Sequence, residues 1–366
     1  MSLDGLLFWV KAVPLLLVIL VPLVLVHEFG HFLVARLVRI RVLEFGLGFP
    51  PKAKVLGHDH ETEYTLNWLP IGGFVRLEGE EENSEDPRAF TNASLAKQIL
   101  VLVAGVTMNV LTAVLLLFVV AWAFNPVVQP TITAVVADSP AAKAGLAAGD
   151  SLISIDGRTH SLLEFSSDAT ASWRQDLLDN GGKTVQLVVA DQNGKQRTLS
   201  VALRVPKSGE GALGVQTGNY ALVNSTGNPV QAMGLAVTGT ERAMSLVLVA
   251  LGDIGKQFAT NPTAGPQGVQ GPVGIASDVG QVASQPNALM LLLLMMAVIS
   301  ANLALVNVLP FPPLDGGKIV IMVLKRVFRS RGVGAVEQWA YLAGFAFLMV
   351  FIGWITYFDI VRGGAP

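Results

Sequence analysis

The sequence predicts a polytopic α-helical membrane protein with four transmembrane helices, a membrane-associated β-loop and an inserted extracytoplasmic α+β domain. Its 366 residues are 52% hydrophobic and only 14% charged, whereas soluble domains are about 25% charged. Four apolar stretches are long enough to cross a bilayer, which takes about 20 residues. Between the second and third stretches the chain changes to short β-like runs separated by Gly and Asp turns. This composition argues against a soluble cytosolic enzyme and against a disordered chain.

The four apolar stretches run from Leu6 to Val38, Ile99 to Phe124, Ala288 to Val308 and Ala340 to Phe358. The last three contain no charged residue. The first begins like a signal peptide, but no cleavage site of small residues follows its apolar run. We therefore expect a retained membrane helix there.

Lys and Arg residues in short loops set the orientation of a membrane protein, because they favour the cytoplasmic side. They gather in two loops, between stretches one and two and between stretches three and four. Both loops should be cytoplasmic, and both termini and the 125–287 region then lie outside. The basic residues are Arg36, Arg39, Arg41, Lys52, Lys54, Arg76, Arg88 and Lys97 in the first loop, and Lys318, Lys325, Arg326, Arg329 and Arg331 in the second.

The outer region predicts a small α+β domain over 126–218. Its expected strands are Thr131–Val136, Ser151–Ile155, Val185–Val189 and Leu199–Leu203, with helical composition over 161–179. Residues 230–258 are also apolar, but they carry charges at mid-length. An amphipathic helix lying on the membrane surface is expected there rather than a fifth span, followed by a loop over 260–272.

The first stretch contains His27-Glu28-Phe29-Gly30-His31, which fits the H-E-x-x-H pattern. Two imidazoles four residues apart on a helix share one face and can bind one metal ion. Glu28 can then act as a general base toward the attacking water. Ionisable groups inside a membrane helix are costly, so a metal site explains this cluster better than packing does.

A catalytic zinc commonly takes three protein ligands, and the chain has no Cys. His58 and His60 indicate a polar turn, and His160 lies outside the apolar stretches. Asp315 follows the third stretch in a proline-rich segment, and His27 and Asp315 both fall near the predicted cytoplasmic ends of their helices. Asp315 is therefore the candidate third ligand. Zinc suits hydrolysis as a Lewis acid, although the same ligands suit Fe(II) or Co(II).

Several motifs together resemble the site-2 protease family, specifically its bacterial RseP-like intramembrane metalloproteases. The likeness covers nearly the whole chain. Its motifs are HEFGH at 27–31, the glycine-rich 45–49, the β-loop at 62–75, Ala104-Gly105 with Asn109, GPVGIA at 271–276 and N-x-x-P-x-P-x-LDGG from Asn307 to Gly317. Val106 departs from the proline common at that position.

The outer domain resembles bacterial PDZ domains through residues 139–146 and 149–157. Only one copy is present, where the best-known enterobacterial members carry two. The resemblance implies that such a domain binds a free peptide C-terminus or acts as a size filter for trimmed substrates.

The resemblance implies an intramembrane zinc endopeptidase of a bacterial cell membrane, with the metal site toward the cytoplasmic side. It implies single-span membrane proteins as substrates, either anti-sigma factors or signal-peptide remnants, with lipid as surroundings. The net charge of −2 argues against a nucleic-acid partner. A free strand edge over 62–68 would bind the unwound substrate by β-addition. Asn307 would hold the substrate backbone, and Asn109, Gly72 and Gly73 are weaker candidates for the same role, since glycines there also suit tight turns and close backbone approach.

Two other classes of function remain as alternatives, a metal transporter and a non-catalytic membrane scaffold. A transporter should carry polar residues along several spans, and a dead enzyme should have lost Glu28. The expected segments are 1–38 (first helix), 39–97 (cytoplasmic loop with the β-loop), 98–125 (second helix), 126–218 (PDZ-like domain), 219–287 (interfacial helix and loop), 288–310 (third helix), 311–338 (LDGG and basic segment) and 339–366 (fourth helix and tail).

Overall fold

The computed structural model describes residues 3–59, 61–80, 84–165, 169–206, 211–225, 228–261, 265, 269–328 and 333–361. His60, Arg329 and Arg331 lie outside these residues. The chain forms two compact units, one of Met1–Leu116 with Ala243–Pro366 and one of Leu117–Arg242.

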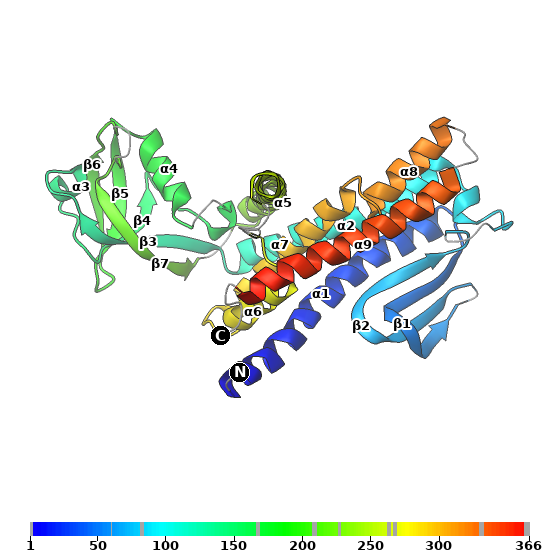
Figure 1. Ribbon diagram of the computed structural model, residues 1–366. Helices are drawn as coiled ribbons and strands as arrows, with labels where there is room; N and C mark the ends of the chain where they lie inside the picture. Colours follow the sequence, from blue (N-terminus) through cyan, green and yellow to red (C-terminus); the bar gives the residue numbers. More distant parts are fainter. Residues whose placement is uncertain are drawn as a thin grey trace. The chain divides into compact units, whose positions relative to one another are not determined.

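Long helices occupy all four predicted apolar stretches. They are α1 (Leu3–Leu37), α2 (Leu95–Ala123), α7 (Ala288–Val308) and α9 (Val333–Val361). Figure 1 draws them running in a common direction across the view. Each is long and apolar enough to cross a membrane.

The expected interfacial helix is one continuous helix, α5 (Pro229–Thr260). It is also long and apolar enough to cross a membrane, so five helices in the described part of the chain meet that condition. The predicted loop over 260–272 falls partly outside the described residues. A short helix that we did not predict follows it, α6 (Pro272–Val282).

Helix α6 packs against both α1 and α9. Adding a Cβ to Gly280 would bring it within 2.6 Å of the Phe8 ring and 2.9 Å of Ala12, so α6 packs closely on the first half of α1. The backbone N–H groups of Gly271 and Gly274 both donate to the Asp359 carboxylate near the end of α9, at 2.9 Å. The N-terminal half of α1 and the C-terminal half of α9 therefore lie at the same end of this unit (Figure 1).

The β-loop is a sheet made by two long strands, β1 (Val42–His58) and β2 (Glu63–Leu77), that each pair along two separate halves. Phe45 pairs with both Tyr64 and Val75, and Val55 pairs with Thr65. The order across the sheet is thus 52–58, 63–67, 42–49 and 72–77. Residues 63–67 are paired on both sides, so the predicted free edge over 62–68 is wrong, because the second half of β1 covers it.

The second unit contains an antiparallel five-stranded sheet in the order β6-β5-β4-β3-β7. The predicted strands correspond to β3 (Pro126–Val135), β4 (Ser151–Ile155), β5 (Thr184–Ala190) and β6 (Gln196–Ala202), and we did not predict β7 (Val215–Asn224). The helical region contains η2 (Leu162–Glu164) and α4 (Ala171–Asp179), and a short α3 (Pro140–Lys143) precedes β4. Trp173 of α4 is 2% exposed, packs in the core and donates its indole N–H to the Val128 carbonyl at 2.8 Å.

Candidate active site

His27 and His31 lie one turn apart near the end of α1, and both are buried. Their ring centroids are 4.7 Å apart and their planes are nearly perpendicular. The two Nε2 atoms face one another at 3.1 Å. The helical spacing therefore brings both imidazoles to one point, as the pattern predicted.

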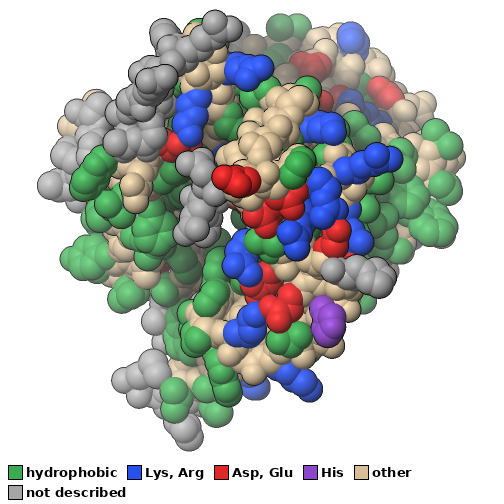
Figure 2. Space-filling model, turned by 90° about the vertical axis from the view of Figure 1, so that its right-hand side faces the viewer, with side chains coloured by type: hydrophobic (Ala, Val, Ile, Leu, Met, Phe, Trp, Pro, Cys, Tyr) green, Lys and Arg blue, Asp and Glu red, His purple; other side chains and the backbone are tan. Residues whose placement is uncertain are grey.

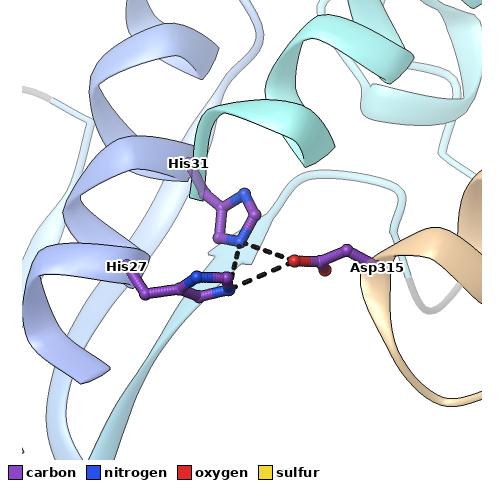
Figure 3. Close-up of side chains that lie close together, drawn as sticks. All are labelled: His27, His31 and Asp315. Carbon is purple, nitrogen blue, oxygen red and sulfur yellow. Dashed lines mark hydrogen bonds and ion pairs between the residues drawn. The ribbon is translucent and has the colours of Figure 1, made fainter. Parts of the chain in front are cut away.

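Asp315 reaches the same point from 288 residues away in the sequence. Its Oδ2 atom lies 3.1 Å from Nε2 of His27 and 3.3 Å from Nε2 of His31 (Figure 3). The carboxylate is buried. Within the described residues, these three form the one cluster of His, Asp and Glu groups close enough to share a metal ion.

The spacing of the three ligand atoms fits zinc. Ligand atoms at 2.0–2.2 Å from a tetrahedral zinc are separated from one another by about 3.3–3.6 Å. The observed separations of 3.1, 3.1 and 3.3 Å are close to these tetrahedron edges. Three ligands leave the fourth position open, which is the arrangement of catalytic sites.

Helix α2 fixes both imidazoles from the other side. His31 Nδ1 lies 2.8 Å from the Val101 carbonyl, and His27 Nδ1 lies 3.2 Å from the side-chain nitrogen of Asn109. A Cβ on Gly105 would sit 2.4 Å from His31 Nε2 and 2.8 Å from His27 Cε1, so this position admits no side chain. The sequence marked Gly105 only as part of a family motif, and its contact with the ligands comes from the structure.

The segment after α7 delivers Asp315 to the site. Asp315 is the first residue of α8 (Asp315–Phe328), which follows the proline-containing turn. A Cβ on Gly316 would sit 2.1 Å from the Val308 carbonyl oxygen, and one on Gly317 would sit 2.5 Å from the Phe311 carbonyl. The two glycines therefore let α8 begin directly against the end of α7, which places the carboxylate beside α1.

A pocket of about 70 Å³ opens beside the ligands, and Glu28 lines it together with His31 and Asp315. This places the predicted general base next to the predicted metal ligands. A second charged pair also lines the pocket, because Lys318 Nζ lies 2.8 Å from Glu80 Oε1. Although burial alone would lower it, the Glu80 carboxylate raises the pKa of Lys318 above its usual range. The sequence analysis did not identify this pair. The available signal was the position of Lys318 one turn after Asp315, which does not point to Glu80.

The other predicted site residues lie around this centre or away from it. Asn307 is partly exposed near the end of α7. Asn109 is fully buried against His27, a geometry that favours contact with the ligand over contact with substrate. Gly72 and Gly73 are buried, and a Cβ on Gly73 would sit 2.8 Å from Leu25. That contact supports close approach of β2 to α1.

His160 belongs to a different cluster, in the second unit. It is 1% exposed, and its two ring nitrogens lie 3.3 Å from Glu164 and 3.1 Å from Asp176. His58 lies on β1, outside the metal cluster. His58 thus ends a strand, where a polar turn was expected.

Comparison with known proteins finds similarity over most of the chain. The model of peptidase family M50 matches residues 15–351. A protein of Clostridium perfringens is 34% identical over 93% of this chain and 95% of its own length. A protein of Rhizobium meliloti is 31% identical over 93% and 95%, and one of Clostridium acetobutylicum is 28% identical over 93% and 94%.

The names of these relatives assign them, provisionally, as zinc metalloproteases. A match to the family model over most of the chain agrees with the metal-binding geometry at the end of α1. The chain belongs to peptidase family M50, the site-2 protease family, and is a zinc-dependent metallopeptidase.

Proposed function

We propose that this enzyme cuts peptide bonds in or near the transmembrane segments of single-span membrane proteins. The observation that carries the proposal is the placement of His27, His31 and Asp315 around one point at the end of an apolar helix, with Glu28 lining the same pocket. A hydrolytic site buried in such a helix suits substrates that themselves lie in the membrane.

His27, His31 and Asp315 would hold zinc, which supplies a Lewis acid that polarises a carbonyl and makes water nucleophilic near neutral pH. Glu28 would accept a proton from the attacking water and return it to the leaving amine. The pocket's small volume, about 70 Å³, limits the water at the site. Asn307, partly exposed on α7 and close in sequence to Asp315, would hold the substrate backbone.

A helical substrate must unwind before it is cut, and its freed backbone groups then need hydrogen-bond partners. The second half of β2 offers such partners, because residues 72–77 pair with β1 on one side and with no other described strand. This strand also contributes Val75 and Leu77 to the pocket wall. We therefore place the substrate-binding edge at 72–77, where an added strand would run toward Glu28.

In the proposed topology, α5 lies on the extracytoplasmic surface of the cell membrane and does not cross it. The middle of α5 packs on the outer domain, because Arg242 donates to the Glu164 carbonyl at 2.6 Å and Gly239 approaches Leu163 and Phe165. If α5 crossed, the chain would need a second crossing before α7. Helix α6 has 11 residues, which span about 16 Å against the ~30 Å of a bilayer core.

Charged residues support a cytoplasmic location for the end of the first unit at which α1 ends. Arg36, Arg41 and Arg88 lie there with the carboxylates that pair with them. Figure 2 views this side and shows Lys and Arg side chains interspersed with Asp and Glu. The metal site, near the end of α1, would then face the cytoplasmic half of a bacterial cell membrane.

The outer domain is proposed to act as a PDZ domain that screens or recruits substrates already cut once. A groove of about 240 Å³ between α4 and the start of β7 supports this role. Its walls include Trp173 and Leu177 of α4 and Leu213 and Val215 near β7. Such a groove suits the free C-terminus of an anti-sigma factor or of a signal-peptide remnant.

A Glu28→Gln variant tests the catalytic proposal. The purified variant should bind zinc as the wild type does and should lose at least a hundredfold of its cleavage of a single-span model substrate. Wild-type cleavage should stop on zinc removal and return on adding zinc back. Undiminished cleavage by zinc-loaded Glu28→Gln would exclude the general-base role. The same variant, expressed in the native membrane, should trap substrates for identification by mass spectrometry.

Accessibility tags test the topology separately. Tags at positions 160 and 85 should label from opposite sides of the membrane, and a tag at position 261 should label from the same side as position 160. Labelling of position 261 from the side of position 85 would show that α5 crosses.

A further inference from the structure

Asn109 is the one polar side chain of α2 that contacts a ligand imidazole among the described residues, and it does not line the pocket beside Glu28. It lies four residues after Gly105, so the two share the face of α2 that meets α1. Gly105 leaves space for the imidazoles, and the Asn109 amide occupies the next turn. Asn109 is 0% exposed, and its amide nitrogen lies 3.2 Å from Nδ1 of His27.

The tautomer of the His27 ring determines which atom of Asn109 must face it. A metal takes the lone pair of Nε2, the atom of His27 that faces His31 and Asp315. The neutral ring then carries its proton on Nδ1, and that N–H needs an acceptor. An amide nitrogen cannot accept, whereas the amide oxygen can.

The amide oxygen of Asn109 is buried and has no partner in the orientation drawn. Oxygen and nitrogen of an amide have nearly the same shape, so their assignment follows from the hydrogen-bond network. Reversing the amide places Oδ1 against Nδ1–H of His27. The metal-binding form of His27 therefore selects the orientation in which Asn109 accepts.

His31 provides an independent parallel. Its Nδ1 lies 2.8 Å from the carbonyl of Val101, two turns earlier on the same helix. An acceptor at that nitrogen likewise leaves Nε2 free for a metal. Helix α2 thus supplies one oxygen to each imidazole, a backbone oxygen for His31 and a side-chain oxygen for His27.

Helix α7 holds Asn109 in place. Ser300 is 0% exposed and donates its hydroxyl to the Asn109 backbone carbonyl at 2.8 Å. The same helix leads into the turn that delivers Asp315. Asn109 therefore lies where α1, α2 and α7 meet, and the Ser300 hydrogen bond ties its backbone to α7.

We propose that Asn109 is a positioning residue, which fixes the ring orientation and tautomer of His27 so that Nε2 points at the metal. The proposal rests on the zinc site proposed above. Groups that accept from a metal-binding histidine typically change metal affinity 10- to 100-fold when they are removed. Asn109 acts on the ligand and touches neither substrate nor reacting atoms.

The test measures zinc affinity of the full-length protein in detergent by competition with a chelating dye. Asn109→Leu, which removes the acceptor at similar size, should weaken zinc binding about 10- to 100-fold. Asn109→Asp keeps an acceptor oxygen and should stay within about threefold of the wild type. Thr107→Val is the matched control, because it removes a hydroxyl from an exposed face of the same helix, and its affinity should not change.

Cobalt(II) absorption gives a second readout that a merely structural role would not move. Asn109→Leu should shift the ligand-field bands of the cobalt form, and Asn109→Asp should restore them. Wild-type zinc affinity together with an unchanged cobalt spectrum in Asn109→Leu would overturn the proposal. His27→Ala tests the zinc site separately from the role of Asn109, since unchanged zinc binding in that variant would overturn the zinc site itself.

Nitrogen NMR of the zinc-loaded wild type keeps the proposal testable if Asn109→Leu does not fold. The ¹⁵N shifts of His27 should show a protonated Nδ1 and a metal-bound Nε2. A metal-bound Nδ1 would refute the role of Asn109.

Discussion

Replacing Gly105 with Ala should damage the metal site through a single methyl group. The added Cβ would lie 2.4 Å from Nε2 and 2.5 Å from Cε1 of His31, and 2.8 Å from Cε1 of His27. Ordinary van der Waals contacts begin at about 3.4 Å. The His31 ring must therefore move by about 1 Å, whereas a functional metal site tolerates about 0.2 Å in its ligand distances.

A displacement of this size predicts two losses. Zinc affinity should fall at least tenfold, because one of the three ligands no longer reaches its position. Cleavage of a single-span substrate at saturating zinc should fall about 100-fold, as expected for a 1 Å error in a catalytic arrangement. Both quantities can be measured on detergent-solubilised protein, by dye competition and by gel-based cleavage.

Gly353→Ala on α9 is the matched control. It is also a glycine within a long apolar helix, but nothing lies within 4 Å of the Cβ that it would gain. Zinc affinity and cleavage should stay at wild-type values. Normal zinc binding and normal cleavage in Gly105→Ala would refute the reasoning, since they would require imidazoles that do not approach α2.

Three further outcomes are expected. Lys318→Met and Glu80→Gln should each lower the thermal midpoint of the full-length protein, and a double-mutant cycle should give a coupling of about 1 kcal/mol for this partly exposed pair. Although burial opposes ionisation, hydrogen bonds with His160 and Ser172 lower the pKa of Glu164. Ionised Glu164 therefore contributes to folding stability above the unfolded pKa of ~4.3, and this contribution is lost as the pH falls through the lower folded pKa. Trp fluorescence should show that Glu164→Gln flattens this part of the stability curve, and a slope equal to that of the wild type would contradict the pairing. Zinc should raise the thermal midpoint of the wild type but not that of His27→Ala.

Local patterns predicted the helices well because each pattern and its physical cause lie in the same segment. Ala288–Val308 matches α7, Ala340–Phe358 lies within α9, and the first two stretches end one residue beyond the ends of α1 and α2. The helix α6 was missed because its 11 residues are too short for a clear period. The strand β7 was missed because most of its residues are exposed on both faces, so no alternation marks it.

The β-loop shows where pattern reasoning failed. The family resemblance indicated a β-loop over 62–75, but register determines which strand forms the edge. The second half of β1 pairs with residues 63–67, whereas residues 72–77 pair with β1 on one side and with no other described strand. No property of either segment alone distinguishes these two arrangements.

The sequence by itself determined the membrane character, the placement of His27 and His31 on one helical face, and the adjacent position of Glu28. These follow from composition and from helical period, which act over a few residues. Asp315 could be named as a candidate by its place after the third stretch, but only the tertiary structure brought its oxygen to 3.1 Å from His27.

Only the tertiary structure also gave Gly105, Asn109 and the Lys318–Glu80 pair their places around the ligands. These contacts depend on the relative rotation and depth of the packed helices. Shifting one helix by one residue against its neighbour would turn each of these side chains away from the ligands. Helical period determines which residues share a face, and packing determines what that face meets.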